Sequence, residues 1–143
     1  MNILSSLIFN IREHLNRYDN LEDYKLSADD IIKIKNFNYK NLPIISGKYS
    51  KKRVHLEDNF EITYIVWDKD SETGLHNHPK NGCIMYLIEG DLVEKRVTDI
   101  MELYIRVKSG NTSYIDDNQG KHKITAKKIS YSFHIYSPPK FYD

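Results

Sequence analysis

The stretch from Gly74 to Gly90, GLHNHPKNGCIMYLIEG, is the most informative segment of this chain of 143 residues. It holds two histidines one residue apart, the one cysteine of the chain, and an apolar run of strand length that ends at a glycine. In a β-strand, residues i and i+2 project to the same face, so His76 and His78 are expected to offer two imidazole nitrogens to one ion. The segment therefore predicts a metal site at the mouth of a β-barrel.

The spacing of these residues resembles the first motif of the cupin proteins. That motif is a His-x-His pair, three or four residues, a glutamate, six residues and a glycine. Here the matching positions are His76, His78, Cys83 and Gly90. A cysteine in place of the glutamate resembles one branch of that superfamily, the type I cysteine dioxygenases, which bind iron through three histidines and no carboxylate.

A second stretch extends this resemblance toward the C-terminus. Members of that family carry Gly-x-His, followed by a strand close to Ser-x-His-x-Tyr-Ser-Pro-Pro. This chain has Gly120-Lys-His122 and then SFHIYSPP at residues 132–139. Two separate motifs in the same order make residues 49–142 similar to this family. The resemblance implies a mainly β fold, a cupin-type double-sheet jelly-roll barrel.

Residue patterns favour the same architecture, a single cupin domain over residues 1–143 with a helical part at 1–40 and a barrel at 44–143. Apolar residues at helical spacing predict an amphipathic helix in the first twenty residues, packed on the barrel wall. Ser27 and Asp30 form a capping-box-like start to a second helix that continues to about Asn36. Short β-branched and aromatic runs between turn residues predict the strands, at 44–54, 60–68, 74–78, 83–89, 91–98, 101–108, 112–116, 121–126 and 129–136.

Composition excludes several classes of partner. The chain has 21 basic and 20 acidic residues, so its charge gives no reason to expect nucleic acid or an anionic membrane. No apolar run approaches the length of a membrane span, and the first residues lack the basic region and cleavage site of a signal peptide. One cysteine cannot form an internal disulfide, which is compatible with a reducing compartment. We expect a cytoplasmic protein and a monomer.

The resemblance implies that His76, His78 and His122 hold Fe(II). Three neutral imidazoles leave three positions of an octahedral ion open and leave its 2+ charge uncompensated, which favours an anionic thiolate as a further ligand. The implied reaction adds both atoms of O2 to the sulfur of L-cysteine and gives cysteine sulfinate. Nickel, zinc and copper also accept three imidazoles, and an exchange of roles between His122 and His134 stays open.

Ser132, His134 and Tyr136 alternate along the last strand, so all three are expected to face the barrel interior. The resemblance implies that the serine orients the histidine, that the histidine hydrogen-bonds the tyrosine, and that the tyrosine hydroxyl meets substrate or oxygen. It also implies a thioether crosslink between Cys83 and Tyr136. The alternatives are a buried polar network that only specifies the core and an unmodified Cys83 that packs as a small apolar side chain.

The chain departs from the family at the group that binds the substrate carboxylate. The family carries Tyr-x-Arg on an early strand, whereas this chain has Tyr49-Ser50-Lys51 and then Lys52-Arg53. Lysine supplies a point charge in place of the bidentate guanidinium, so it orients a carboxylate less strictly. Arg53 lies on the same strand face as Lys51 and is the second candidate cation.

The leading hypothesis is an iron-dependent thiol dioxygenase that uses L-cysteine and O2. A dioxygenase for another small thiol, such as 3-mercaptopropionate, is an alternative. A cupin that binds a metal or small ligand without turnover is a third, and an isomerase or sugar-binding barrel is a fourth. Oxygen uptake separates the enzyme from the binding protein, and iron content separates the dioxygenase from the last alternative.

Overall fold

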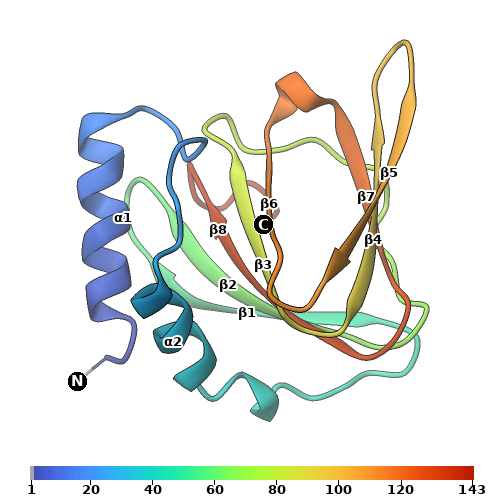
Figure 1. The fold of residues 1–143 in the computed structure, drawn as a ribbon, viewed down its shortest axis with the longest axis horizontal. Coiled ribbons are helices and arrows are strands. Elements are labelled where there is room, and N and C mark those ends of the chain that lie inside the picture. Colours follow the sequence, from blue (N-terminus) through green and yellow to red (C-terminus); the bar gives the residue numbers. More distant parts are fainter. Residues whose placement is uncertain (1) are drawn as a thin grey trace.

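The computed structural model describes residues 2–143, in which two α-helices precede the strands (Figure 1). Helix α1 (Ser5–Arg17) buries the apolar stripe that its sequence predicts. Helix α2 (Ala28–Asn36) begins after Ser27, whose hydroxyl accepts a hydrogen bond from the Asp30 N–H, and Asp30 accepts one from the Ser27 N–H in return. Both predicted helices are confirmed. Neither has the length and apolarity needed to cross a membrane.

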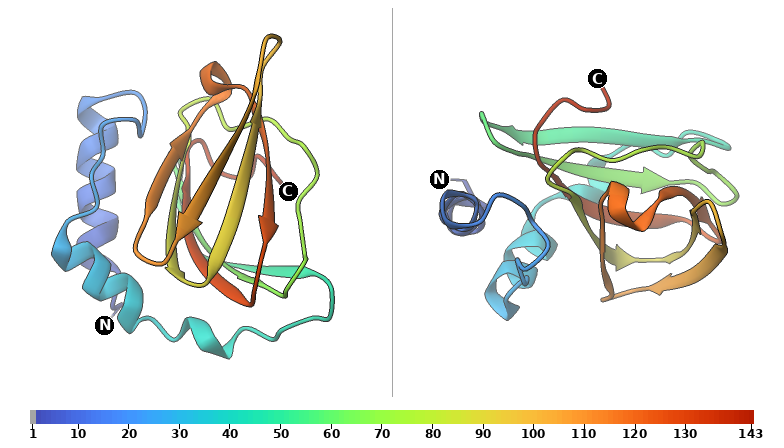
Figure 2. Two further views of the ribbon diagram at one scale, coloured as in Figure 1. Left: turned by 45° about the vertical axis from the view of Figure 1, so that its right-hand side comes forward. Right: turned by 90° about the horizontal axis from the view of Figure 1, so that it is seen from above.

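The rest of the described chain forms two antiparallel sheets, which confirms the mainly β jelly roll. One sheet has five strands in the order β1-β2-β8-β3-β6, and the other has three in the order β5-β4-β7. Figures 1 and 2 show the two helices beside the first sheet, with β4, β5 and β7 on the far side of the barrel. The strand bounds are β1 Tyr49–Leu56, β2 Glu61–Trp67, β3 Cys83–Glu89, β4 Asp91–Val97, β5 Glu102–Lys108, β6 Thr112–Ile115, β7 Lys121–Ala126 and β8 Ser130–Tyr136.

Strands β2, β3 and β8 are buried on both faces, because the five-stranded sheet lies between two apolar layers. Its outer face carries residues such as Tyr64 and Phe133, which pack with the helices in one core cluster. Its inner face carries Ile65 and Leu87, which pack against the three-stranded sheet in a second cluster. The helices therefore complete the wall of the barrel, and the inner face is left for a pocket between the sheets.

The structure corrects one expected strand. Residues 74–78 form a loop rather than a strand. An isolated bridge joins His76, in the middle of this loop, to His122, near the start of β7. The N–H of His78 donates to Asp117 Oδ1 at 2.9 Å instead of to a ladder, and Pro79 then has no N–H to donate. Pairing is thus intermittent along this segment. The strand expected from residue 44 also begins later, at Tyr49.

Candidate metal centre

Three histidines from two distant parts of the chain converge at one end of the barrel. His76 and His78 lie on the loop before β3, and His122 lies on β7. One ring nitrogen of each lies within 4.8 Å of the others. His78 and His122 are buried, and His76 is half-buried at the rim. The structure thus brings together the three residues that the motifs single out, through the fold rather than through a shared strand face.

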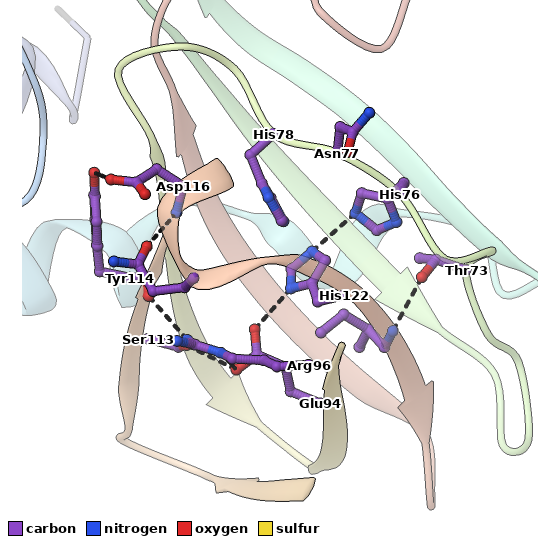
Figure 3. A network of polar contacts seen from close by, with 12 residues as sticks. Thr73, His76, Asn77, His78, Glu94, Arg96, Ser113, Tyr114, Asp116 and His122 are labelled. Atoms are coloured by element: carbon purple, nitrogen blue, oxygen red, sulfur yellow. Dashed lines mark hydrogen bonds and ion pairs between the residues drawn. The ribbon is translucent and has the colours of Figure 1, made fainter. Parts of the chain in front are cut away.

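The acid beside this cluster is Glu94, on the inner face of β4. Its Oε2 lies 2.7 Å from Nδ1 of His122 (Figure 3), and its side chain is 1% exposed. Burial alone would raise the pKa of Glu94. The hydrogen bond from His122 and the charge and hydrogen bond of Arg96 outweigh burial and hold the pKa below its usual range, so Glu94 is a carboxylate.

In two of the histidines, His76 and His122, the Nδ1 atom points away from the cluster and hydrogen-bonds an acceptor. Nδ1 of His76 lies 2.8 Å from the Gly74 carbonyl oxygen, and Nδ1 of His122 faces Glu94. Because carbonyls and carboxylates only accept, both Nδ1 atoms carry hydrogen. In neutral rings the two Nε2 lone pairs then face each other at 2.8 Å. Facing lone pairs repel unless a cation lies between them, so the pair fits a metal ion.

His78 supports the same conclusion. Both of its ring nitrogens are buried without a hydrogen-bond partner among the described residues. Asp117 Oδ1 lies 3.4 Å from Nδ1 but makes its hydrogen bond to the backbone N–H. Burial and the neighbouring imidazoles lower the pKa of His78 to about 4, which keeps the ring neutral and able to bind a metal. A buried orphan nitrogen is costly, and coordination would satisfy it.

Cys83 and Tyr136 lie directly opposite each other on the neighbouring strands β3 and β8. Both are buried and pack with Ile115 in a small cluster at the same end of the barrel. Burial raises the pKa of the Cys83 thiol and of the Tyr136 hydroxyl, so both groups are protonated in the metal-free protein. The strand register therefore places the two expected crosslink partners side by side.

Ser132 and His134 belong to a chain of buried hydrogen bonds that begins at Trp67. The indole N–H donates to Ser132 Oγ at 2.8 Å, and Oγ lies 2.7 Å from Nε2 of His134. Burial lowers the pKa of His134 to about 3, so the ring that shares this hydrogen bond with the serine hydroxyl is neutral. Among the described residues no hydrogen bond joins His134 to Tyr136, and their rings stack 5.6 Å apart. That expected contact is absent.

A narrow internal cavity of about 40 Å³ is lined by residues of the histidine cluster together with Cys83, His134 and Tyr136. It adjoins a wider opening of about 340 Å³, lined by Tyr49, Lys51, His76, Tyr136 and Tyr142 among others. The size of this opening suits a small ligand. Of the expected substrate-binding residues, Tyr49 and Lys51 therefore border the same opening as His76, whereas Arg53 lines a neighbouring pocket with Glu61 and Asp143.

The two candidate cations differ in their partners. Arg53 donates to both carboxylate oxygens of Asp143 at 3.0 Å and lies 3.5 Å from Glu61. Lys51 has no salt-bridge partner among the described residues, and its ammonium lies 5.8 Å from the centre of the Tyr142 ring. Lys51 is thus the available cation beside the cluster, whereas the charge of Arg53 is already compensated.

Sequence reasoning missed Glu94 and Tyr142. Glu94 lies two residues after the inward-facing Leu92, so a glutamate in the apolar phase of a strand was the available signal. Tyr142 gave no local signal. Its ring lies 5.4 Å from that of His76 and 5.2 Å from that of Tyr136, and its hydroxyl donates to the carbonyl of Asn77.

Comparison with solved structures defines the class of fold. A cupin superfamily protein from Desulfitobacterium hafniense superimposes with a TM-score of 0.60 at 10% identity, over 70% of this chain and 86% of that one. KdgF from Halomonas sp. gives a TM-score of 0.59 at 16% identity, over 73% of this chain and 92% of that one. These likenesses establish the fold alone: the chain has a cupin-type fold.

The family model for cysteine dioxygenase type I matches residues 38–142. The chain belongs to this family. Cysteine dioxygenase type 1 of Rattus norvegicus and of Mus musculus are each 24% identical over 91 residues, covering 56% of this chain and 46% of theirs. The chain therefore spans about half the length of these relatives.

Proposed function

We propose that this protein is an iron-dependent thiol dioxygenase that oxidises L-cysteine with O2 to cysteine sulfinate. One observation carries the proposal: three imidazoles converge within 4.8 Å beside a cavity lined by Tyr136 and Cys83, and Lys51 lines the adjoining opening. Membership of the cysteine dioxygenase type I family supports the same reaction. The overall change balances, because one thiol and one O2 give one sulfinic acid with both oxygens on sulfur.

His76, His78 and His122 would hold the iron, and the iron would supply O2 activation and a binding position for a thiolate. The three rings would bring no negative charge into direct contact with the metal, which favours an anionic sulfur ligand. The pocket walls then fix the substrate close to the reacting atoms, and this proximity accounts for a large part of the rate. Burial raises the pKa of the Tyr136 hydroxyl, so it is protonated and would donate a hydrogen bond to a substrate that enters the pocket.

We assign the substrate carboxylate to Lys51. It borders the wider opening beside His76, and it lacks the competing acids that hold Arg53. A lysine holds a carboxylate through a single point charge, so the geometry at this position is less restrictive than in relatives with arginine. This accommodates 3-mercaptopropionate as the second candidate substrate, because both thiols carry a carboxylate.

The test is oxygen consumption by the Fe(II)-loaded protein with L-cysteine, 3-mercaptopropionate and cysteamine, together with the mass of each product. We expect L-cysteine to gain two oxygen atoms, and His122→Ala to abolish the reaction. His14→Ala is the matched control, because His14 lies on α1 and bonds the Asn20 carbonyl. Bound iron without oxygen uptake for any thiol would refute the enzyme and leave a metal-binding cupin.

The role of Lys51 has its own test. Loss of a charged hydrogen bond costs about 1.5–3 kcal/mol, so Lys51→Met should lower kcat/KM for L-cysteine roughly 10- to 100-fold. Cysteamine lacks a carboxylate, and its rate should be unchanged. Lys52→Met is the control, since Lys52 projects from the opposite face of β1. An equal loss for cysteamine and L-cysteine would remove Lys51 from carboxylate binding.

A further inference from the structure

A closed polar network lies behind the metal cluster and meets it at His122 (Figure 3). Its central residue is Glu94, which is fully buried between the two sheets. Oε2 of Glu94 faces Nδ1 of His122 at 2.7 Å. Oε1 accepts from Arg96 Nε at 3.1 Å and from the Ser113 hydroxyl at 3.2 Å. Each carboxylate oxygen therefore has a defined and separate set of donors.

The network fixes the position of the carboxylate from three sides. Arg96 also donates to the Tyr114 carbonyl at 2.9 Å and to Ser113 Oγ at 3.1 Å, so its guanidinium spans from β4 to β6. Such multiple hydrogen bonds hold a side chain in one rotamer. Since Glu94 and His122 lie on the paired strands β4 and β7, the sheet register itself brings the carboxylate to the imidazole.

This geometry determines which nitrogen of His122 faces the cluster. A carboxylate accepts only, so Nδ1 of His122 carries the hydrogen and Nε2 presents its lone pair toward His76 and His78. A carboxylate behind a histidine ligand also increases the electron density that the ring offers to a metal. The residue at the cupin acid position is Cys83, so Glu94 places a negative charge near the metal through His122 instead.

We propose that Glu94 is a positioning residue of the metal centre, which holds His122 in the Nδ1–H tautomer and strengthens it as a ligand. This inference rests on the metal site of the proposed function. It assigns a role to an acid outside both sequence motifs. It also explains why a glutamate and an arginine occupy inward positions of β4, where apolar side chains would otherwise pack.

The first test compares metal affinity in Glu94→Gln and in the wild-type protein. Co2+ dissociation constants are measured by competition with a chelator, and the visible absorption spectrum of bound Co2+ is recorded. Loss of an outer carboxylate typically weakens binding 10- to 100-fold, and we expect that range with a shifted spectrum. Glu57→Gln is the matched control, because Glu57 and His55 form a 2.6 Å pair on the outside of the barrel.

The outcomes separate the two proposals. If the wild-type protein binds no Co2+, the metal site itself is wrong. If the wild type binds and Glu94→Gln binds equally well with the same spectrum, the metal site stands and the role of Glu94 is wrong. Circular dichroism of the metal-free variant checks its fold. Should that variant not fold, ¹⁵N NMR of the metal-free wild-type protein at neutral pH decides: an Nε2–H tautomer of His122 would overturn the inference.

Discussion

Gly90 shows at the scale of a residue why a motif position is restricted. Its φ is +126°, a backbone conformation that residues other than glycine rarely adopt. A Cβ at this position would lie 2.6 Å from the Cα of Ser130 and 2.1 Å from its hydroxyl oxygen. The tight turn between β3 and β4 therefore needs both the conformational freedom and the small size of glycine. That turn directs β4, and with it Glu94, back across the barrel.

We predict that Gly90→Ala destabilises the protein by more than about 2 kcal/mol, because backbone strain and a steric clash add. The measurement is urea denaturation of the metal-free protein. Gly47→Ala is the control: Gly47 has a φ of +71°, but a Cβ there meets no atom within 4 Å. Its cost should be about 1 kcal/mol, from strain alone. Equal losses in the two variants would show that the contact with Ser130 is relieved without cost.

At the scale of the element, α2 depends on the reciprocal hydrogen bonds of its first turn. Asp30 is 1% exposed and accepts from the Ser27 N–H at 3.0 Å and from the Tyr24 hydroxyl at 2.9 Å. Ser27 contributes one side-chain acceptor to the same turn. Asp30 thus joins the helix start to the loop before it, whereas Ser27 acts only on the helix.

We predict a larger loss of stability for Asp30→Ala than for Ser27→Ala. Removal of an N-cap side chain costs about 1 kcal/mol. Removal of Asp30 leaves three donors without their acceptor, the Ser27 N–H, the Tyr24 hydroxyl and the Asn10 amide, and should cost about 2–4 kcal/mol. The free energies of unfolding of the two variants, measured by urea titration, test this order. A loss for Ser27→Ala that equals or exceeds that for Asp30→Ala would contradict this order.

The segment after β8, residues 137–143, places Tyr142 beside the histidine cluster. Tyr142 covers one side of His76 and is held by its hydrogen bond to the Asn77 carbonyl, 2.8 Å long. The ring also lies beside that of Tyr136, and the rings of Tyr142, Tyr136 and His76 all border the wider opening.

We predict that Tyr142→Ala exposes His76 to modification. Diethyl pyrocarbonate should label His76 of the metal-free variant several-fold faster than in the wild-type protein, as followed by mass spectrometry. His14 in the same samples is the internal reference, because it lies on α1 away from the cluster. An unchanged labelling rate would mean that Tyr142 does not cover the histidine in solution.

At the scale of the whole molecule, enclosure between two sheets keeps His134 neutral. Burial, aided by Lys51, His76 and His122, lowers its pKa from 6.5 to about 3. The unfolded chain binds a proton there below pH 6.5, and the folded chain does not until about pH 3. Stability therefore falls as the pH decreases through this window.

We predict that His134 contributes about 2 kcal/mol to the loss of stability of the metal-free protein between pH 7 and pH 5, since one pKa unit corresponds to about 1.4 kcal/mol. Free energies of unfolding of the wild type and of His134→Gln at the two pH values provide the measurement. The wild type should lose about 2 kcal/mol more than the variant. Equal losses would place the proton uptake at other residues.

The sequence predicts most of the elements, because their signals are local. The capping pair Ser27 and Asp30 marks α2, and alternation marks the inward face of β8. The segment at 74–78 was predicted wrongly, since a His-x-His pair looks the same in a strand and in a loop. Asp117, 39 residues along the chain, accepts the hydrogen bond of the His78 N–H. No local pattern contains that contact.

The sequence by itself determined the β-rich barrel, its two helices and the residues of the two histidine motifs, because periodicity, turns and spacing are properties of neighbouring residues. Only the tertiary structure decided which groups meet. The register of β4 on β7 brings Glu94 to His122. Asp143 pairs with Arg53, while Lys51 has no salt-bridge partner within the part of the chain that the structure describes, and the last segment places Tyr142 beside His76. These contacts join residues far apart in the chain, and they depend on the distances and burial that folding creates.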